Sequence, residues 1–445
     1  MAGESSPLTL GDVVTLQRGT TYKSALLGQP GPVLLGLGSI QRNGGFRDDS
    51  LKTYGGESPA KLTLHPGDIY VSLKDVTQSA DLLGAIARVP PHVPAGRVTQ
   101  DTVKLTFIRK DVPSGYLYWL MRTPFYREYC RAHAIGTTNL SIAREDFLAF
   151  PVPKPKAREL TLVETLDALD DKIELNRRMN ATLEAMARAL FQSWFVDFDP
   201  VRAKLDGRPP AALDPATAAL FPEHFAHGEH DMLPLGWRLA AIGEVCAINA
   251  WTLGKNDDLQ TLEYVEISEV SRGNIANIAT YPRGEEPSRA RRRLRHGDTV
   301  LSTVRPDRGS YFLALNPPEN RVASTGFAVL TPAKVPWSFL HAALTQPEVS
   351  DHLGQMADGG AYPAVRPEII GAMQVALPNE PKILEAFHRA CAPLFEQAEA
   401  NRTQSRTLAT LRDMLLPKLL SGELSVAGGN SPEFPDSSNQ RNPKP

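Results

Sequence analysis

A short stretch of this sequence occurs twice, at positions far apart in the chain. ELNRRMNATL at 174–183 returns as EANRTQSRTL at 399–408; Asn401 minus Asn176 is 225, as is Leu408 minus Leu183. LHPGDIYVS at 64–72 likewise returns as LRHGDTVLS at 294–302, at an offset of 230. Self-similarity over most of a chain is the signature of a repeated structural unit. The sequence therefore predicts a tandem duplication in the order domain, helix, domain, helix.

The globular part of each repeat mixes strands, turns and helices. Short runs of Val, Ile and Leu, such as DIYVSL and DTVLSTV, are separated by turns rich in Gly and Pro, whereas 116–133 and 337–353 have helical patterns. We therefore expect an α+β fold with two tandem α+β domains. The expected boundaries are 1–153 for the first domain, 154–199 for the first helix, 200–234 for a linker, 235–378 for the second domain, 379–426 for the second helix and 427–445 for a disordered tail.

The two repeated helices carry a heptad pattern with polar interruptions. Residues 160–194 contain no Pro or Gly, and stepping alternately by 4 and 3 from Leu162 follows an apolar seam broken by Asn176 and Asn180. The second copy has Asn401 at the register of Asn176. A buried Asn penalises registers that leave its amide unpaired. Two helices related by a pseudo-two-fold axis would pair antiparallel, as a spacer of about 52 Å at ~1.5 Å per residue. Alternatively, each helix packs only on its own domain.

Composition restricts the class of protein. The chain has 445 residues, 42% of them apolar, which suffices for ordinary cores, and its three cysteines form no CxxC pair. No apolar run is long enough to span a membrane and the N-terminus lacks a signal-peptide pattern, so we expect a cytoplasmic protein. The net charge of -2 argues against a generic polyanion binder.

Three longer stretches carry a family resemblance. DDKIELNRRMNATLEAMARALFQSWFVDFDPVRAK at 170–204, LPLGWRLAAIGEV at 233–245 and LRDMLLPKLLSGEL at 411–424 resemble the specificity (S) subunit of type I restriction-modification systems. The resemblance runs over essentially 1–426. Arg412, which interrupts the second seam, is its main departure.

The resemblance implies a function without chemistry in this chain. Each α+β domain would be a target recognition domain that reads one half of a bipartite sequence in double-stranded DNA, and the antiparallel coiled coil would fix the gap. Two methyltransferase (M) subunits and restriction (R) subunits would assemble around it. S-adenosylmethionine, ATP and Mg would belong to those partners, with no cofactor in this chain. A spacer several helical turns long fits half-sites that recur at ~34–36 Å on one face of B-DNA.

Side chains in corresponding loops of the two domains are the candidates for reading DNA. Arg and Lys read guanine, Asn and Gln read adenine, and apolar groups contact the thymine methyl. The candidates are Arg42, Asn43, Lys74, Gln78, Thr137, Thr138 and Asn139 in the first domain, and Arg272, Asn274, Arg305, Arg308, Tyr362 and Arg366 in the second. Any one of them could equally be a solvated loop residue.

The densest basic run is RARRRLR at 289–295. Arg291, Arg292 and Arg293 would contact phosphates, or would form a charged face balanced by Glu285 and Glu286.

The outward faces of the first helix are expected to dock methyltransferase subunits. Arg177, Phe191, Trp194 and Phe195 are the candidates, because aromatic and Arg side chains are frequent interface anchors. Core packing explains the aromatic residues equally well.

Motifs for chemistry are weak. LNPPEN at 315–320 has Glu319 where a base-flipping methyltransferase needs an aromatic residue, so we interpret it as a loop. His224, His227 and His230 could bind zinc, but a polar linker is the better interpretation, and no metal site is expected. The alternative functions are a single-chain DNA adenine methyltransferase or nuclease with its own recognition domains, and a protein-only scaffold.

Overall fold

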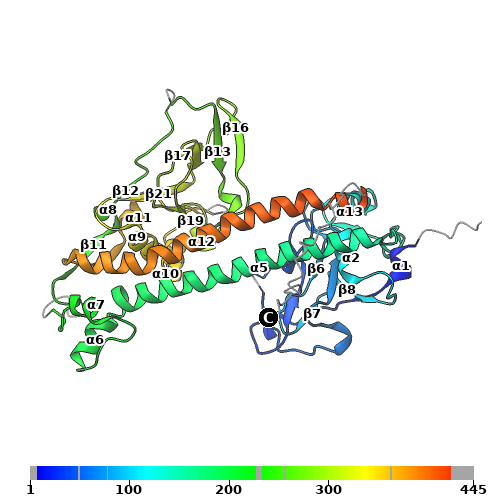
Figure 1. Cartoon of the computed structure of the whole chain (residues 1–445), viewed down its shortest axis with the longest axis horizontal. Coiled ribbons are helices and arrows are strands. Elements are labelled where there is room, and N and C mark those ends of the chain that lie inside the picture. The colour runs from blue at the N-terminus through cyan, green and yellow to red at the C-terminus, as the bar shows by residue number, and fades with distance from the viewer. Residues whose placement is uncertain are drawn as a thin grey trace, which may run out of the picture. The chain divides into compact units, whose positions relative to one another are not determined.

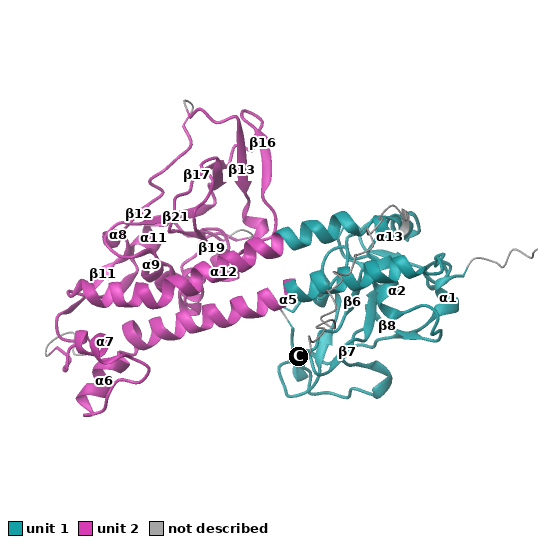
Figure 2. Cartoon of the chain, in the orientation of Figure 1, with its two compact units in different colours: residues 1–172, 407–445 teal, residues 173–406 magenta. Residues whose placement is uncertain are grey.

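The computed structural model describes residues 8–48, 51–77, 79–226, 233–254, 257–360 and 363–421. The chain forms two compact units (Figure 2). Unit 1 comprises residues 1–172 and 407–445, and unit 2 comprises residues 173–406. The expected tail at 427–445 lies outside the described residues.

Unit 1 is built on a four-stranded antiparallel sheet in the order β1-β8-β4-β6. These strands are β1 (Val14–Arg18), β8 (Thr102–Phe107), β4 (Ile69–Ser72) and β6 (Ile86–Arg88). Smaller sheets join β2 (Val33–Leu35), β7 (Gly96–Val98) and β3 (Thr63–Leu64), and β5 (Lys74–Asp75), β10 (Leu140–Ile142) and β9 (Ala134–Ile135). Its helices are α1 (Leu10–Val13), α2 (Ser114–Leu120), α3 (Pro124–Ala132), α4 (Arg144–Leu148) and α13 (Lys418–Ser421), with 3-10 turns η1 (Ser24–Leu26), η2 (Leu37–Ser39) and η3 (Ala60–Leu62).

Unit 2 contains a sheet of the same kind, in the order β12-β21-β18-β19. These strands are β12 (Cys246–Ile248), β21 (Phe327–Pro332), β18 (Asp298–Ser302) and β19 (Tyr311–Ala314). A second sheet has the order β16 (Ala279–Pro282), β13 (Thr261–Val265), β20 (Arg321–Ser324) and β17 (Ala290–Arg293). The pairs β11 (Trp237–Ala241) with β22 (Gln374–Pro378) and β14 (Val270–Ser271) with β15 (Asn274–Ile275) complete the strands. The helices are α8 (Ile242–Val245), α9 (Trp337–Leu344), α10 (Pro347–Gln355) and α11 (Pro367–Ala372), with turns η5 (Ile267–Glu269) and η6 (Pro306–Arg308).

The two main sheets show the duplication in three dimensions. Strand β4 contains the end of LHPGDIYVS and strand β18 contains the end of LRHGDTVLS, and both lie third in a four-stranded order. Each strand ends in the same turn: the Ser72 hydroxyl donates to the Lys74 carbonyl, and the Ser302 hydroxyl donates to the Val304 carbonyl. The α+β fold with two β-rich domains and two long helices is therefore confirmed.

The two long helices are α5 (Ala157–Phe191) and α12 (Pro381–Leu415), which pack together (Figure 1). Helix α12 continues through Pro393, where we would expect a kink. Helix α5 is followed by a π-helical turn, η4 (Gln192–Val196), and this continuous helical segment stops before Phe198, which takes a left-handed φ of 56°. The expected linker contains two further helices, α6 (Asp199–Leu205) and α7 (Pro215–Leu220), and a buried Phe221.

Over the described ranges, none of the helices combines the length and the apolar character that a membrane crossing requires.

Candidate functional site

The candidate loops of unit 1 are joined to one another through the small sheet β5-β10-β9. Lys74 lies in β5 opposite Ser141 of β10, and its ammonium group is 3.0 Å from Asp101. Thr137, Thr138 and Asn139 are exposed in the turn between β9 and β10. The structure therefore brings Lys74 and this turn onto one sheet.

The loop that contains Arg42 and Asn43 contacts the segment that follows β5. The Asn43 amide donates to the Asp81 carbonyl at 2.8 Å, and the Arg42 guanidinium lies 3.9 Å from the Asp81 carboxylate. Asn43 has a φ of 62°, a left-handed conformation that Asn tolerates well. Gln78, the remaining candidate of the first domain, lies outside the described residues.

In unit 2 the hairpin β14-β15 and the loop 305–309 form a second cluster. The Arg272 amide donates to the Gly309 carbonyl at 2.8 Å, and the Arg308 amide donates to the Arg305 carbonyl. Asn274 pairs with Ser271 across the hairpin. Arg366 is exposed directly before α11 and follows Val365, whose amide donates to the Thr303 carbonyl. The structure therefore brings four of the five described candidates, Arg272, Asn274, Arg305 and Arg308, into two bonded loops, and Tyr362 lies outside the described residues.

One backbone hydrogen bond recurs in both clusters. In unit 1 the Gly45 backbone amide donates to the Ile86 carbonyl at 2.8 Å, and in unit 2 the Gly273 backbone amide donates to the Tyr311 carbonyl at 2.7 Å. Ile86 and Tyr311 are equivalent positions, because they pair with Val71 and Leu301, which differ by the repeat offset of 230. The two candidate loops are therefore equivalent parts of the duplicated fold.

The basic run at 289–295 belongs to a different sheet, in strand β17. Arg291 lies 3.6 Å from Glu286, and Arg293 lies 3.5 Å from Asp257 and 3.8 Å from Glu319. Arg292 is half-buried, and burial lowers the pKa of its guanidinium. Two of the three charges are thus balanced within the chain, which favours the charged-face interpretation, with Glu286 as one of the balancing residues.

The asparagines of the helix seam are buried and hydrogen-bonded across it. The Asn401 side-chain amide donates to the Asn180 Oδ1 at 2.9 Å, and the Asn180 amide donates to the Ala398 carbonyl at 2.9 Å. The Asn176 amide group donates to Gln404 Oε1 at 2.8 Å. Asn176 of α5 bonds to Gln404 of α12, whereas Asn180, further along α5, bonds to Ala398, which is earlier in α12. The two helices therefore run antiparallel. The role of these residues in setting the register remains a prediction.

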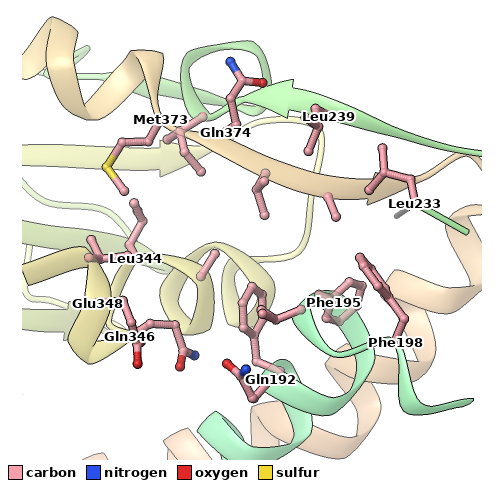
Figure 3. Close-up of a pocket in the computed structure, with 17 residues that line it drawn as sticks. Gln192, Phe195, Phe198, Leu233, Leu239, Leu344, Gln346, Glu348, Met373 and Gln374 are labelled. Atoms are coloured by element: carbon pink, nitrogen blue, oxygen red, sulfur yellow. The ribbon is translucent and has the colours of Figure 1, made fainter. Parts of the chain in front are cut away.

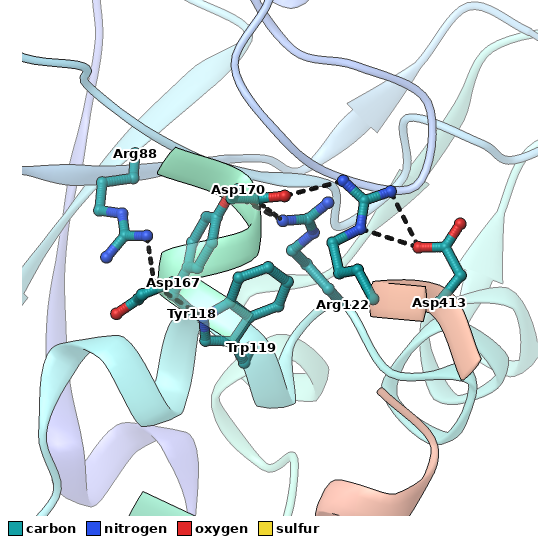
Figure 4. A network of polar contacts seen from close by, with 8 residues as sticks. Arg88, Tyr118, Trp119, Arg122, Asp167, Asp170 and Asp413 are labelled. Carbon is teal, nitrogen blue, oxygen red and sulfur yellow. Dashed lines mark hydrogen bonds and ion pairs between the residues drawn. The ribbon is translucent and has the colours of Figure 1, made fainter. Parts of the chain in front are cut away.

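In unit 1 the first part of α5 is held to α2 and to the end of α12 by a network of charges (Figure 4). Asp170 accepts hydrogen bonds from Arg122 and Arg412, both at 2.8 Å. Burial raises the pKa of Asp170, but the two guanidinium groups outweigh that effect and lower it. Arg412, the residue that interrupts the sequence seam, therefore has a half-buried carboxylate partner.

A second acid one turn earlier extends this network. Asp167 accepts from Arg88 at 2.6 Å and from the Trp119 indole at 2.8 Å. The Arg122 guanidinium also stacks 4.5 Å from the Trp119 ring. The helix is thus docked on unit 1 through charged and aromatic groups together.

The expected outward position of the three aromatic docking candidates is wrong. Phe191, Trp194 and Phe195 are each 3% exposed, and they pack with Phe339 and Phe387 in the core of unit 2. Apolar character alone does not distinguish an interface anchor from a core residue, and here core packing applies. Arg177 does face outward and pairs with Glu174 at 2.8 Å.

An apolar cavity of about 620 Å³ lies beside this aromatic core, within unit 2 (Figure 3). It is lined by Phe195 and Phe198 near the π-helical turn, by Leu239 of β11 and by Leu344 of α9, with Gln192 and Gln346 among its few polar groups. Such a lining offers no set of convergent acids, bases or metal ligands.

The motifs for chemistry do not form sites in the described part of the chain. LNPPEN forms the loop between β19 and β20, and Glu319 in it is exposed and near Arg293. The described residues contain no cluster of His, Cys, Asp or Glu that could hold a metal ion. His227 and His230 lie outside those residues, so the zinc alternative rests on positions that the structure leaves out.

Two buried charged residues, Asp75 and Arg127, were not among the sequence candidates although both hold a candidate loop. Asp and Arg side chains are almost never fully buried unless they are paired, so sequence alone gave no signal for their burial.

Comparisons with known proteins agree with this architecture. The chain is 25% identical over 323 residues to the type I restriction enzyme HindI specificity subunit of Haemophilus influenzae, covering 62% of this chain and 69% of that protein. It is 23% identical over 327 residues to the MjaIX specificity subunit of Methanocaldococcus jannaschii, covering 72% and 71%. No protein-family model matches the chain.

A solved structure supports the same fold. The type I restriction-modification S subunit from M. genitalium matches 94% of this chain and 97% of its own, with a TM-score of 0.52 and 14% sequence identity.

Proposed function

Because this chain belongs to the family of type I restriction-modification specificity subunits, we propose that each of its β-rich domains reads one half of an interrupted DNA sequence. Specificity subunits are the non-catalytic components of their complexes. The observation that carries the proposal is the backbone hydrogen bond that recurs in both units, from Gly45 to Ile86 and from Gly273 to Tyr311, which marks equivalent loops in two domains of equivalent strand order. Equivalent loops with different side chains are what two readers of different half-sites require.

The side chains proposed to contact DNA are those that the described loops present together. In unit 1 these are Arg42, Asn43, Lys74 and the turn 137–139, and in unit 2 they are Arg272, Asn274, Arg305, Arg308 and Arg366. Arg and Asn offer the donor patterns that distinguish guanine from adenine in the major groove. The net charge of -2 is compatible with this function if partner subunits supply part of the phosphate contacts.

We assign the gap between the half-sites to helices α5 and α12. Each helix has 35 residues, and at ~1.5 Å per residue each is about 52 Å long. One turn of B-DNA, over which half-sites recur on one face, measures ~34–36 Å. The buried asparagines of the seam would keep the two helices in a single register, and hence the gap constant.

We place the docking of methyltransferase subunits on the outer face of α5, in place of the buried aromatic residues. Leu175, Met179 and Met186 are 42%, 38% and 50% exposed, and their spacing of 4 and 7 puts them on one face of the helix. Arg177 is exposed on the adjacent face. Apolar side chains exposed in a row on a helix indicate a binding surface.

Retention of partner subunits tests this docking face. Changing Leu175, Met179 and Met186 together to Ser should lower the amount of methyltransferase subunit that co-purifies with the chain, without a change in its circular dichroism. Thr161→Ser, Thr165→Ser and Thr182→Ser together, on exposed positions of the same helix, are the control. Unchanged co-purification would rule the face out.

The proposed function is tested by base-resolved adenine methylation of host DNA with the gene intact and deleted. We expect an interrupted two-part motif to be methylated only when the gene is present. Methylation of a single uninterrupted motif would contradict reading by two domains. Cofactor binding by the purified chain alone would favour the single-chain methyltransferase.

A further inference from the structure

The segment after β5 is folded around a buried carboxylate. Asp75 has no exposed surface, and it accepts hydrogen bonds from the amides of Thr77 at 2.6 Å, Leu82 at 2.6 Å and Leu83 at 3.1 Å. A carboxylate that binds backbone amides makes stronger hydrogen bonds than a neutral acceptor. Both ends of the loop formed by residues 74–77 and 79–83, which we call the clamped loop, are therefore tied to one side chain.

A buried guanidinium holds the same loop from helix α3. Arg127 is 3% exposed, and its Nη2 donates to the carbonyls of Ala80 at 2.8 Å and Asp81 at 3.0 Å. Its Nη1 donates to the Leu83 carbonyl at 2.5 Å. Asp75 thus binds the amides and Arg127 binds the carbonyls of the clamped loop, which leaves its backbone little freedom to change conformation.

The outer side of the clamped loop faces solvent. Val76 is 63% exposed although it lies between Asp75 and a residue bonded to Asp75. Ala80 is held at a φ of 56°, a left-handed conformation that an Ala side chain disfavours. Asp81 also accepts the amide of Asn43, one of the candidate DNA-reading residues. Two buried charged residues thus fix the conformation of a loop whose outer side is exposed. Such a rigid surface is suited to binding a ligand whose shape it must match closely.

Among the described residues of unit 2, the clamp has no copy. The position equivalent to Asp75 at the offset of 230 is Arg305, which has a φ of 47° and donates its amide to Pro363. The equivalent loop in unit 2 is therefore held by other contacts. A change in the clamp should affect only the domain that contains it.

We propose that Asp75 and Arg127 are positioning residues that hold the clamped loop in the one conformation that reads its DNA half-site. This inference rests on the proposed function. It assigns to the first domain a loop whose shape is set from inside the protein, with Lys74 and Val76 on its outer side, and it predicts that loosening the clamp relaxes one half of the target while leaving the other half unchanged.

The test uses the whole chain co-expressed with its methyltransferase subunits and base-resolved methylation of the host DNA. Arg127→Lys keeps the charge but cannot bond three carbonyls in the planar geometry of the guanidinium. We expect sites with one mismatch in a single half of the motif to become methylated about five-fold more often or higher, because one base pair is worth ~1–3 kcal/mol of discrimination. Arg131→Lys, exposed one turn further along α3, should leave the motif unchanged.

Relaxation of both halves together, or a uniform decrease in methylation with an unaltered motif, would overturn the inference, since either result indicates a general loss of stability. Asp75→Asn, which keeps one acceptor oxygen, should relax the same half as Arg127→Lys. Relaxation of opposite halves by the two changes would also overturn it.

Amide hydrogen exchange on the purified chain keeps the inference testable if the variant complex is inactive. We expect the amides of residues 79–83 to exchange at least about ten-fold faster in Arg127→Lys, with β4 and β8 unchanged. Unchanged exchange in this loop, or faster exchange throughout unit 1, would overturn the clamp. Absence of any interrupted motif in the wild type would instead contradict the proposed function, and the exchange result would still report on the loop.

Discussion

Buried polar side chains carry much of the specificity of this fold at the scale of single residues. The sequence repeat identified Asn176, Asn180 and Asn401, because a polar residue at an apolar seam position recurs at the same register. It could not identify their partners, since the Ala398 carbonyl and the Gln404 amide come from the facing helix. Asp75 and Arg127 were missed for a related reason: their burial depends on loops distant in sequence.

The pairing of Asn180 with Asn401 can be tested by stability measurements. Asn401→Ala removes the donor to Asn180 Oδ1 and leaves a buried acceptor unpaired, so the free energy of unfolding should fall by about 1–3 kcal/mol. Asn180→Leu combined with Asn401→Leu should cost less than the sum of the two single changes, because no buried amide is then left alone. Urea unfolding measures both. A double variant that loses the full sum or more would show that the two amides are not coupled.

The buried carboxyl group of Asp298 should make the stability of the protein depend on pH. Burial raises the pKa of this carboxyl from 3.8 to about 6, against the opposing effects of its hydrogen bonds and of Arg295 and His296. The folded state therefore binds the proton more tightly than the unfolded chain. Stability from this group is fully present below pH about 4 and is lost as the pH rises to about 6.

Asp298→Asn should remove that loss while keeping an acceptor for the Arg295 amide. We expect the variant to be more stable than the wild type at pH 7 by roughly 1–3 kcal/mol, since two units of pKa correspond to at most about 3 kcal/mol. The difference should shrink as the pH is lowered toward 4. A constant difference across this range in urea titrations would show that the charge of Asp298 is not responsible.

At the scale of elements, the two ends of helix α5 pack in their units by different chemistry. Asp167 and Asp170 on α5 bind Arg88, Arg122 and Arg412 in unit 1. In unit 2 the end of α5 instead contributes Phe191, Trp194 and Phe195 to an aromatic core. Sequence periodicity predicted the long helices and their seam. It could not tell whether an aromatic residue packs in the seam, packs in a domain core or lies on the outer face, because aromatic residues occur in all three places.

The charge network of unit 1 should be costly to disrupt. Asp170→Ala leaves Arg122, whose side chain is 6% exposed, without its carboxylate partner. Removing one partner of a buried ion pair typically costs about 3–5 kcal/mol. We expect a decrease of that order in the free energy of unfolding, whereas Asp171→Ala, the exposed neighbour, should change it by less than about 0.5 kcal/mol. Similar values for both variants would show that the network contributes little to stability.

At the scale of the whole chain, the sequence showed the duplication, but it did not show how the two copies differ in their smaller sheets. The repeats at 225 and 230 predicted two α+β domains and two long helices, and the equal strand orders agree with them. Unit 2 has a second four-stranded sheet, β16-β13-β20-β17. Among the described strands of unit 1, the sheets other than the main one have three strands each. The basic run at 289–295 belongs to that sheet, and its pairing with Asp257 and Glu286 depends on contacts that local sequence does not encode.

The most direct test of two independent readers joined by a fixed spacer is an exchange of one domain. Residues 1–153 would be replaced by the first recognition domain of another specificity subunit with a known target, and host DNA methylation would be determined at base resolution. We expect one half of the methylated motif to change to that of the donor, with the other half and the gap unchanged. A changed gap, or a change in both halves, would contradict the assignment of one half-site to each domain and of the gap to α5 and α12.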